Sequence, residues 1–473
     1  MKAQTKRLSL PALLILCTAG FVKADLAEQI DAIIAKALAQ KVKFSIHIIE
    51  ADSGETVYDH DARELMIPAS NMKLMVSAAA LKYLGPDYVY RTRVGLSGNQ
   101  LVVIGSGDPL LGDEKTDEKY GRESGWIFKD IIHALNAKGI DTIEDIIVDS
   151  SRFDNERVHP SWPAKDLNKW FACEVSGLNY NDNCVVLTAK NINGRVSVFV
   201  EPPTSFLTII NEVEPISTGT SVLGSNRNRT ANKLTVFGRC KDTAGPIDVA
   251  IQRPAAYFGY LLAERLAGAQ IEAKGQLIEK ELGEDSDFVL LVEFCTKIED
   301  CMARCNKNSL SLAAEALLKT IAASGNPDGK GGSWQKGQER IGEYLLGLHI
   351  DKSQFYIDDG TGLSRQNELT AYAITTVLSD IYQSRNWQFY RNTLAVGGVD
   401  GTIARHFQDE KYKGRIRAKT GYISGVRSLS GVCHTDGGDY LFSILANNAY
   451  NLQRAAINKI AETIIDSYAA ETP

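Results

Sequence analysis

The sequence predicts a mixed α/β (α+β) protein in which a strand-rich insertion interrupts the core. Residues 43–58 alternate apolar and polar side chains around a turn, which is typical of a β-hairpin. From about residue 92 to about residue 250, short strands separated by turns replace the helical periodicity found on both sides. With 473 residues, the chain is long enough for two or three domains and a sizeable core.

Periodicity and turn residues predict the remaining elements in order. The apolar run after Lys73 predicts a buried helix that ends near Gly85. The strands expected inside the insertion cover residues 100–105, 145–149, 184–189 and 195–201. After the insertion we expect helices over residues 255–267 and 310–321, strands over 415–420, 428–433 and 440–446, and a last helix over 452–468. We therefore assign residues 25–92 and 255–473 to a discontinuous core domain, and residues 93–254 to the insertion.

The first 24 residues differ from the rest of the chain. Basic residues precede an apolar stretch over residues 8–21, and small residues end at Ala24, as in a secretory signal peptide. That stretch is too short to cross a membrane. Its removal takes away four basic residues and no acidic ones, so the net charge changes from −6 to −10, which disfavours nucleic-acid binding. We therefore expect a protein secreted across the cytoplasmic membrane, periplasmic or extracytoplasmic, with no integral membrane span and no nucleic-acid partner.

Seven of the eight cysteines lie beyond residue 24. Export permits disulfides, and an odd number of cysteines leaves at least one thiol unpaired. Cys173 and Cys184 bracket a short polar segment and form the favoured pair, whereas Cys301 and Cys305 lie one helical turn apart, too far for an unstrained bond. The seven histidines are scattered and no C-x-x-C occurs, so we expect no metal site and no cofactor.

The segment Ser-Asn-Met-Lys at residues 70–73 is the most informative chemical signal. It follows a proline and precedes the predicted helix, so Ser70 and Lys73 share a helix face and the lysine amine can approach the serine hydroxyl. Serine is a poor nucleophile until a base takes its proton, and lysine can be that base when burial or a neighbouring cation lowers its pKa. The S-x-x-K pattern is loose, however. A second copy, Ser333 to Lys336, lies in a Gly-rich stretch that we expect to be a solvated loop.

Four further segments supply possible partners for Ser70. Lys-Thr-Gly at 419–421 can present an ammonium and a hydroxyl to a substrate carboxylate, while its glycine lets the substrate lie close to the strand. Ser-Leu-Ser at 309–311 opens a predicted helix, where serine is also common as an N-cap. Asp-Gly-Thr-Gly-Leu-Ser-Arg at 359–365 and Gly-Gly-Val-Asp-Gly-Thr at 397–402 are ordinary turns when each is taken alone.

Together, the order and spacing of these segments resemble the low-molecular-mass D-Ala-D-Ala carboxypeptidase/endopeptidase family of the penicillin-binding protein 4 type (peptidase family S13). That family carries P-A-S-x-x-K-L, a long insertion, S-x-N, D-G-[ST]-G-L-S-R and K-T-G in this order. The resemblance covers nearly the whole chain after residue 24 and includes residues 105–111, which are similar to the family's G-x-G-D-P-x-L. It implies a penicillin-recognising serine transpeptidase/β-lactamase-like core, with an antiparallel sheet flanked by helices.

The resemblance also implies an activity. It implies a serine DD-peptidase that hydrolyses D-Ala-D-Ala or D-alanyl cross-links of peptidoglycan stem peptides through an acyl-enzyme, with β-lactam antibiotics as covalent inhibitors. At the matching positions, the resemblance implies Ser70 as the nucleophile, Lys73 as its general base, and Ser309 as a bridge between Lys73 and the leaving nitrogen. It implies that Lys419, Thr420 and Gly421 lie at the substrate carboxylate, and that the backbone N–H groups of Ser70 and Tyr422 form the oxyanion hole. It also implies that Arg365 lies near the site and that Asp182 projects from the insertion over the cleft.

One position departs from the family pattern. Ser311 stands where the family has an asparagine whose amide binds the substrate backbone. Serine is shorter, and losing one good polar contact costs roughly 1–3 kcal/mol. We therefore expect an active enzyme with altered efficiency or substrate preference. A catalytically impaired homologue that binds peptidoglycan is one alternative. A serine β-lactamase or esterase is another, although the long insertion disfavours it.

Overall fold

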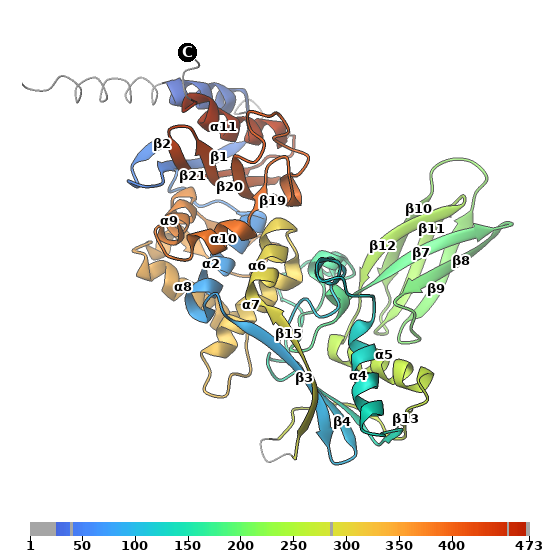
Figure 1. Cartoon of the computed structure of the whole chain (residues 1–473). Coiled ribbons are helices and arrows are strands. Elements are labelled where there is room, and N and C mark those ends of the chain that lie inside the picture. The colour runs from blue at the N-terminus through green and yellow to red at the C-terminus, as the bar shows by residue number, and fades with distance from the viewer. Residues whose placement is uncertain (1–24, 38–40, 284–286, 452–453, 470–473) are drawn as a thin grey trace, which may run out of the picture.

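The computed structural model places a six-stranded antiparallel sheet beside a group of helices, from which the insertion extends (Figure 1). The structure describes residues 25–37, 41–283, 287–451 and 454–469. The predicted signal peptide, residues 1–24, lies outside the described residues. Within the described part of the chain, no helix is both long enough and apolar enough for a membrane crossing. The predicted α+β fold class is confirmed.

The six-stranded sheet joins the first and last parts of the chain. Its order is β18-β19-β20-β21-β1-β2, and all neighbours are antiparallel. The strands are β1 (Lys43–Glu50), β2 (Thr56–His60), β18 (Ala395–Val396), β19 (Ile416–Ile423), β20 (Val426–Thr435) and β21 (Gly438–Asn447). Strands β1 and β2 form the predicted hairpin. Helix α11 (Arg454–Ser467) and the helical residues 25–37 share an apolar core with this sheet.

A second apolar core lies among the helices that adjoin the sheet. These helices are α2 (Met72–Leu84), α6 (Ile298–Lys307), α7 (Ser311–Ser324), α8 (Trp334–Gly347), α9 (Ala371–Tyr382) and α10 (Trp387–Thr393). Helix α2 is central, because its alanine-rich apolar sequence is buried at every residue from Met72 to Leu81. It ends where Gly85 takes a positive φ of 80°, a common end for a helix.

The insertion begins and ends in two neighbouring antiparallel strands, visible in Figure 1 as a long pair leading away from the helices. Strand β3 (Val89–Ser97) leaves the helical group, and β15 (Val289–Lys297) returns to it, with Val89 opposite Lys297. Both belong to a five-stranded sheet of order β14-β6-β4-β3-β15. The other elements of this part are β4 (Gln100–Ile104), β6 (Ile146–Asp149), β14 (Leu277–Glu279), α3 (Glu114–Lys119), α4 (Trp126–Ala137) and α5 (Pro254–Gly268).

Two three-stranded sheets form the outer part of the insertion (Figure 1). Their orders are β12-β7-β8 and β10-β11-β9, and they contact each other through β10 with β12 and β8 with β9. The strands are β7 (Cys184–Ile192), β8 (Arg195–Glu201), β9 (Thr208–Pro215), β10 (Val222–Arg227), β11 (Lys233–Cys240) and β12 (Thr243–Ala250). Two short pairs complete the described strands: β5 (Thr142–Ile143) with β13 (Glu272–Ala273), and β16 (Phe355–Tyr356) with β17 (Glu368–Leu369).

The packing of α5 and the pairing of β15 bear on where the insertion ends. The sequence-based division assigns residues 255–297 to the core domain. In the structure, α5 packs against β6 and β14, and β15 pairs with β3. Helical periodicity predicts a helix here but does not show which sheet the helix covers. We propose that the insertion spans residues 89–297.

The favoured disulfide is absent from the described structure. All seven cysteines there are free thiols, including Cys173 and Cys184. Both lie in the same apolar core as α2, and burial raises the pKa of each thiol. The two side chains therefore pack as small apolar groups.

Candidate active site

Ser70 lies in a tight turn, η1 (Ala69–Asn71), directly before α2. Two glycines allow other segments to approach this turn. A Cβ atom at Gly421 would lie 3.1 Å from Ser70 N, and one at Gly362 would lie only 1.9 Å from Ala69 O. Strand β19 and the loop over residues 359–365 can therefore contact the serine backbone only because glycine occupies these positions.

Lys73 is fully buried beside Ser70, as the three-residue spacing predicts. Its Nζ donates to Ser70 Oγ at 3.1 Å, to Thr361 Oγ1 at 2.7 Å and to Thr361 O at 2.8 Å. Burial lowers the pKa of Lys73, although the nearby carboxylates of Asp359 and Glu315 act in the opposite direction. A lysine with a lowered pKa has a larger neutral fraction near neutral pH, and the neutral amine can accept a proton.

A second buried lysine, Lys419 on β19, lies beside Ser309. Its Nζ donates to Ser309 Oγ at 2.9 Å and to Thr420 O at 2.8 Å. Burial and then the charge of Lys73 lower the pKa of Lys419. The predicted bridge from Ser309 to Lys73 is not formed among the described hydrogen bonds. The acceptors of Lys73 are on Ser70 and Thr361, and Ser309 accepts from Lys419 instead.

Ser311 is connected to Lys73 through one intervening residue. Thr361 Oγ1 donates to Ser311 Oγ at 2.7 Å and accepts from Lys73 Nζ at 2.7 Å. Thr361 was not among the predicted site residues. The signal that could have identified it is its place in the Asp-Gly-Thr-Gly-Leu-Ser-Arg segment. Ser311, the position that departs from the family pattern, is therefore hydrogen-bonded to a residue that itself binds the buried Lys73.

The buried carboxylate of Glu315 on α7 holds the loop that carries Thr361. Glu315 accepts hydrogen bonds from the backbone N–H groups of Gly360 at 3.1 Å and Thr361 at 2.7 Å, and from Trp334 Nε1 at 2.8 Å. Burial, and then the charge of Asp359, raises the pKa of Glu315 to about 8.

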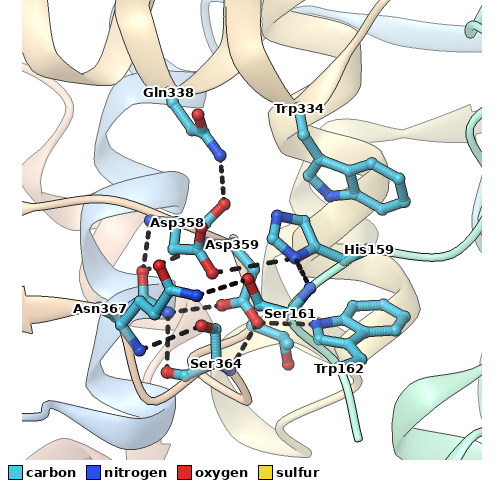
Figure 2. A network of polar contacts seen from close by, with 12 residues as sticks. His159, Ser161, Trp162, Trp334, Gln338, Asp358, Asp359, Ser364 and Asn367 are labelled. Carbon is cyan, nitrogen blue, oxygen red and sulfur yellow. Dashed lines mark hydrogen bonds and ion pairs between the residues drawn. The ribbon is translucent and has the colours of Figure 1, made fainter. Parts of the chain in front are cut away.

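Asp359 lies in the same loop and holds its shape by accepting hydrogen bonds from neighbouring residues (Figure 2). Its carboxylate accepts from the backbone N–H groups of Gly362 at 2.7 Å and Ser364 at 2.8 Å, and from the Asn367 amide at 2.7 Å. The indole N–H of Trp162, which belongs to the insertion, donates to it at 2.9 Å. Asp359 therefore links the insertion directly to the loop that holds Lys73.

A cavity of about 770 Å³ opens over these groups. The predicted residues that line it are Ser70, Ser309, Ser311, Thr420, Tyr422 and Arg365. Arg365 also contacts the backbone oxygen of Ser424 on the same wall. The insertion contributes Pro163, Lys165, Asp166, Trp170 and Phe171. This volume is typical of a ligand site, and both hydroxyl and cationic side chains line it.

Asp182 does not line this cavity, contrary to the prediction. It lies in the turn η4 (Asn181–Asn183), and its carboxylate pairs with Arg304 at 3.4 Å, which also binds Asp113 at 2.6 Å. These contacts hold Asp182 away from the cavity. The acidic residue that the insertion does place there is Asp166, in a polar stretch that carries no motif.

The second S-x-x-K copy is not a solvated loop. Ser333 is the N-cap of α8, and its Oγ accepts from Lys336 N at 3.2 Å. The amine of Lys336 instead donates to Asn326 Oδ1 at 2.9 Å. This serine therefore begins a helix, one of the commonest structural uses of serine.

A serine beside a buried lysine, between an antiparallel sheet and a helical group, is the arrangement of the penicillin-recognising serine hydrolases. A sequence profile of the D-Ala-D-Ala carboxypeptidase 3 (S13) family matches residues 26–470, and the chain belongs to this family. The predicted enzyme class, a serine-type D-Ala-D-Ala carboxypeptidase, is confirmed, and neither alternative is favoured.

Individual relatives agree with this family. The D-alanyl-D-alanine carboxypeptidase of Actinomadura sp. (strain R39) is 27% identical over 455 residues, covering 89% of this chain and 81% of that protein. The D-alanyl-D-alanine carboxypeptidase DacB of Haemophilus influenzae is 23% identical, with 85% and 84% covered. The crystal structure of penicillin binding protein 4 (dacB) from Haemophilus influenzae shares the fold, with a TM-score of 0.76 at 21% identity over 91% of this chain and 97% of that one.

Proposed function

We propose that this chain hydrolyses D-Ala-D-Ala termini or D-alanyl cross-links of peptidoglycan stem peptides, with Ser70 as the acylated nucleophile. The observation that carries the proposal is the 3.1 Å contact between Ser70 Oγ and the buried Lys73 Nζ at the cavity. Family membership supports the substrate class. β-Lactam antibiotics should acylate the same serine.

In acylation, neutral Lys73 takes the proton of Ser70 as Oγ attacks the carbonyl carbon of the penultimate D-alanine. The backbone N–H groups of Ser70 and Tyr422 stabilise the oxyanion, typically by ~3 kcal/mol per donor. The C–N bond then breaks, and Lys73 delivers the proton taken from Ser70 to the leaving nitrogen. In deacylation, water attacks the ester carbon, Lys73 takes its proton, and the C–O bond breaks to restore Ser70.

Lys419 and Thr420 bind the substrate carboxylate in this scheme. Burial and Lys73 lower the pKa of Lys419 in the free protein. A carboxylate bound beside its amine acts in the opposite direction, because an opposite charge favours the protonated form. Substrate binding therefore favours the protonated form of Lys419, and a charge there in turn helps to keep Lys73 neutral.

We also propose that the protein acts outside the cytoplasmic membrane, where peptidoglycan lies. The apolar stretch at residues 8–21 and the small residues before Asp25 support export and cleavage. N-terminal sequencing of the protein recovered from an exporting host should begin at Asp25. A start at Met1 would contradict export with cleavage.

A penicillin-labelling experiment tests the proposed activity. We expect a fluorescent penicillin to form a covalent adduct on the peptide that contains Ser70 and none on the peptide that contains Ser333. We also expect the protein to release D-alanine from a pentapeptide ending in D-Ala-D-Ala. Absence of the Ser70 adduct would contradict the proposal, and rapid turnover of the penicillin would instead identify a β-lactamase.

Replacing Ser311 by asparagine should raise kcat/KM for peptide substrates. The amide oxygen can still accept from Thr361, as Ser311 Oγ does at 2.7 Å, while the amide N–H₂ reaches further into the cavity. One added polar contact predicts an increase of roughly 5- to 150-fold. Ser311→Ala is the matched control, and its rate should fall because Thr361 loses its acceptor. Unchanged peptide turnover and deacylation in Ser311→Asn would show that Ser311 does not limit the reaction.

A further inference from the structure

A second cavity, of about 520 Å³, adjoins the one over Ser70. Thr402, Thr420 and Tyr422 line both cavities. We call the second cavity the arginine pocket, and the residues that line it alone are His406, Arg427, Tyr450, Asn451 and Arg454.

Two arginines, Arg427 and Arg454, make the lining of the arginine pocket cationic. Arg454 donates from its two terminal nitrogens to Ser428 O at 2.8 Å and Gly421 O at 3.0 Å, which fixes it against the strand of the Lys-Thr-Gly segment. Arg427 lies over the Tyr422 ring, with its guanidinium carbon 4.1 Å from the ring centroid. Among the described residues that line this pocket, none is acidic. The ion pairs found in the described part of the chain include neither arginine.

The positive charges in this pocket act on one another. Burial and then the charge of Arg427 lower the pKa of Arg454 to about 10. Burial and then the charge of Arg454 lower the pKa of His406. Like charges held together in a partly buried cavity repel each other, and a bound anion relieves that repulsion.

In the proposed scheme, the arginine pocket lies on the leaving-group side of the reaction. In the proposed scheme Thr420 binds the carboxylate next to the scissile bond, and its hydroxyl donates to Thr402 at 2.9 Å. A substrate chain that continues past Thr420 away from Ser70 therefore enters the arginine pocket. Arg365 and the insertion residues line the first cavity alone, so they have no part in the arginine pocket.

We propose that the arginine pocket binds a carboxylate on the leaving half of a cross-linked stem peptide, so that cross-links are cleaved in preference to single pentapeptides. This inference rests on the proposed function of Ser70. A leaving D-alanine has one carboxylate, which Lys419 and Thr420 already bind, and it leaves the arginine pocket unused. The leaving half of a cross-link continues into a second stem peptide, which carries carboxylates of its own.

The chemistry of cross-link cleavage is that of the proposed scheme and needs only water. The D-alanyl C–N bond breaks as the Ser70 ester forms, and the leaving amine of the second stem peptide takes the proton. Water then hydrolyses the ester to the free D-alanyl carboxylate. The arginine pocket contributes binding of the leaving half and no bond-forming step.

The test compares kcat/KM for a cross-linked dimer and for a pentapeptide with the same stem chemistry. Arg427→Gln should lower the dimer-to-pentapeptide ratio by about tenfold, the effect of one charge-assisted hydrogen bond, and Arg427→Glu should lower it further. Arg427→Lys keeps the charge and should stay near the wild-type ratio. The matched control is Arg405→Gln, because Arg405 is exposed and lies outside the pocket lining.

Each outcome decides the inference. An unchanged ratio in both Arg427→Gln and Arg427→Glu overturns it. An equal fall for both substrates also overturns it, because the pocket would then bind the carboxylate that the two substrates share. Penicillin acylation of the wild-type protein separates this inference from the proposed function. If acylation is absent, the proposed function is contradicted. If acylation is normal but the dimer-to-pentapeptide ratio is unchanged in the variants, only the role of the arginine pocket is contradicted. Acylation of each variant also shows that it is folded.

Discussion

Replacement of Lys73 by methionine should slow penicillin acylation of Ser70 by about 10²- to 10⁴-fold, the usual contribution of a general base. Methionine keeps the length and apolar contacts of this fully buried side chain but removes the amine that donates to Ser70 Oγ at 3.1 Å. The measurement is the second-order rate of acylation, with thermal unfolding to show that the variant is folded. Lys336→Met, in the second S-x-x-K copy, is the matched control and should acylate at the wild-type rate, because its amine binds Asn326.

The pH dependence of acylation provides a second check on Lys73. The neutral amine is the base, so the wild-type rate should fall as pH falls through the pKa of Lys73 in the folded protein. Burial places that pKa below the ordinary value of 10.5, so the active form persists to lower pH than an exposed lysine would allow. Lys73→Met should lose this dependence. If the variant keeps the wild-type pH profile, another group takes the proton of Ser70.

Local patterns predicted most of the elements of this fold. The alternating residues of 43–58 form the hairpin of β1 and β2, and the strand predicted over 195–201 is β8. Which elements pack together was harder to predict, because pairing between distant segments leaves little trace in a single sequence. The pairing of β3 with β15 and the packing of α5 on β6 and β14 are the contacts on which the proposed insertion, residues 89–297, is based.

The same limit applies to the site. The contact between Ser70 and Lys73 is local, since i and i+3 positions share one helix face. By contrast, Lys73 and Thr361 are 288 residues apart in the chain, and no periodicity predicts their hydrogen bonds. For Asp182, the family resemblance implied a place over the cleft, but the tertiary fold pairs it with Arg304 instead.

Replacing Glu315 by glutamine should slow acylation by about 10²-fold although Glu315 does not line the cavity. Its two carboxylate oxygens accept three N–H donors, from Gly360, Thr361 and Trp334. Glutamine offers one acceptor oxygen, and its N–H₂ group would face a donor. At least one buried N–H then loses its partner, which costs roughly 1–3 kcal/mol of unfolding free energy. A displaced Thr361 no longer positions the amine of Lys73.

The pH dependence of stability separates this positioning role from a simple loss of packing. The pKa of Glu315 is raised from 4.5 to about 8, so its contribution to stability is complete below pH 4.5 and is lost as pH rises through about 8. Glu315→Gln should remove this part of the pH dependence, since an amide does not titrate. Glu339→Gln on the exposed face of α8 is the control and should keep both the rate and the wild-type pH dependence. If Glu315→Gln acylates at the wild-type rate, the carboxylate of Glu315 is not needed to position Thr361 and Lys73.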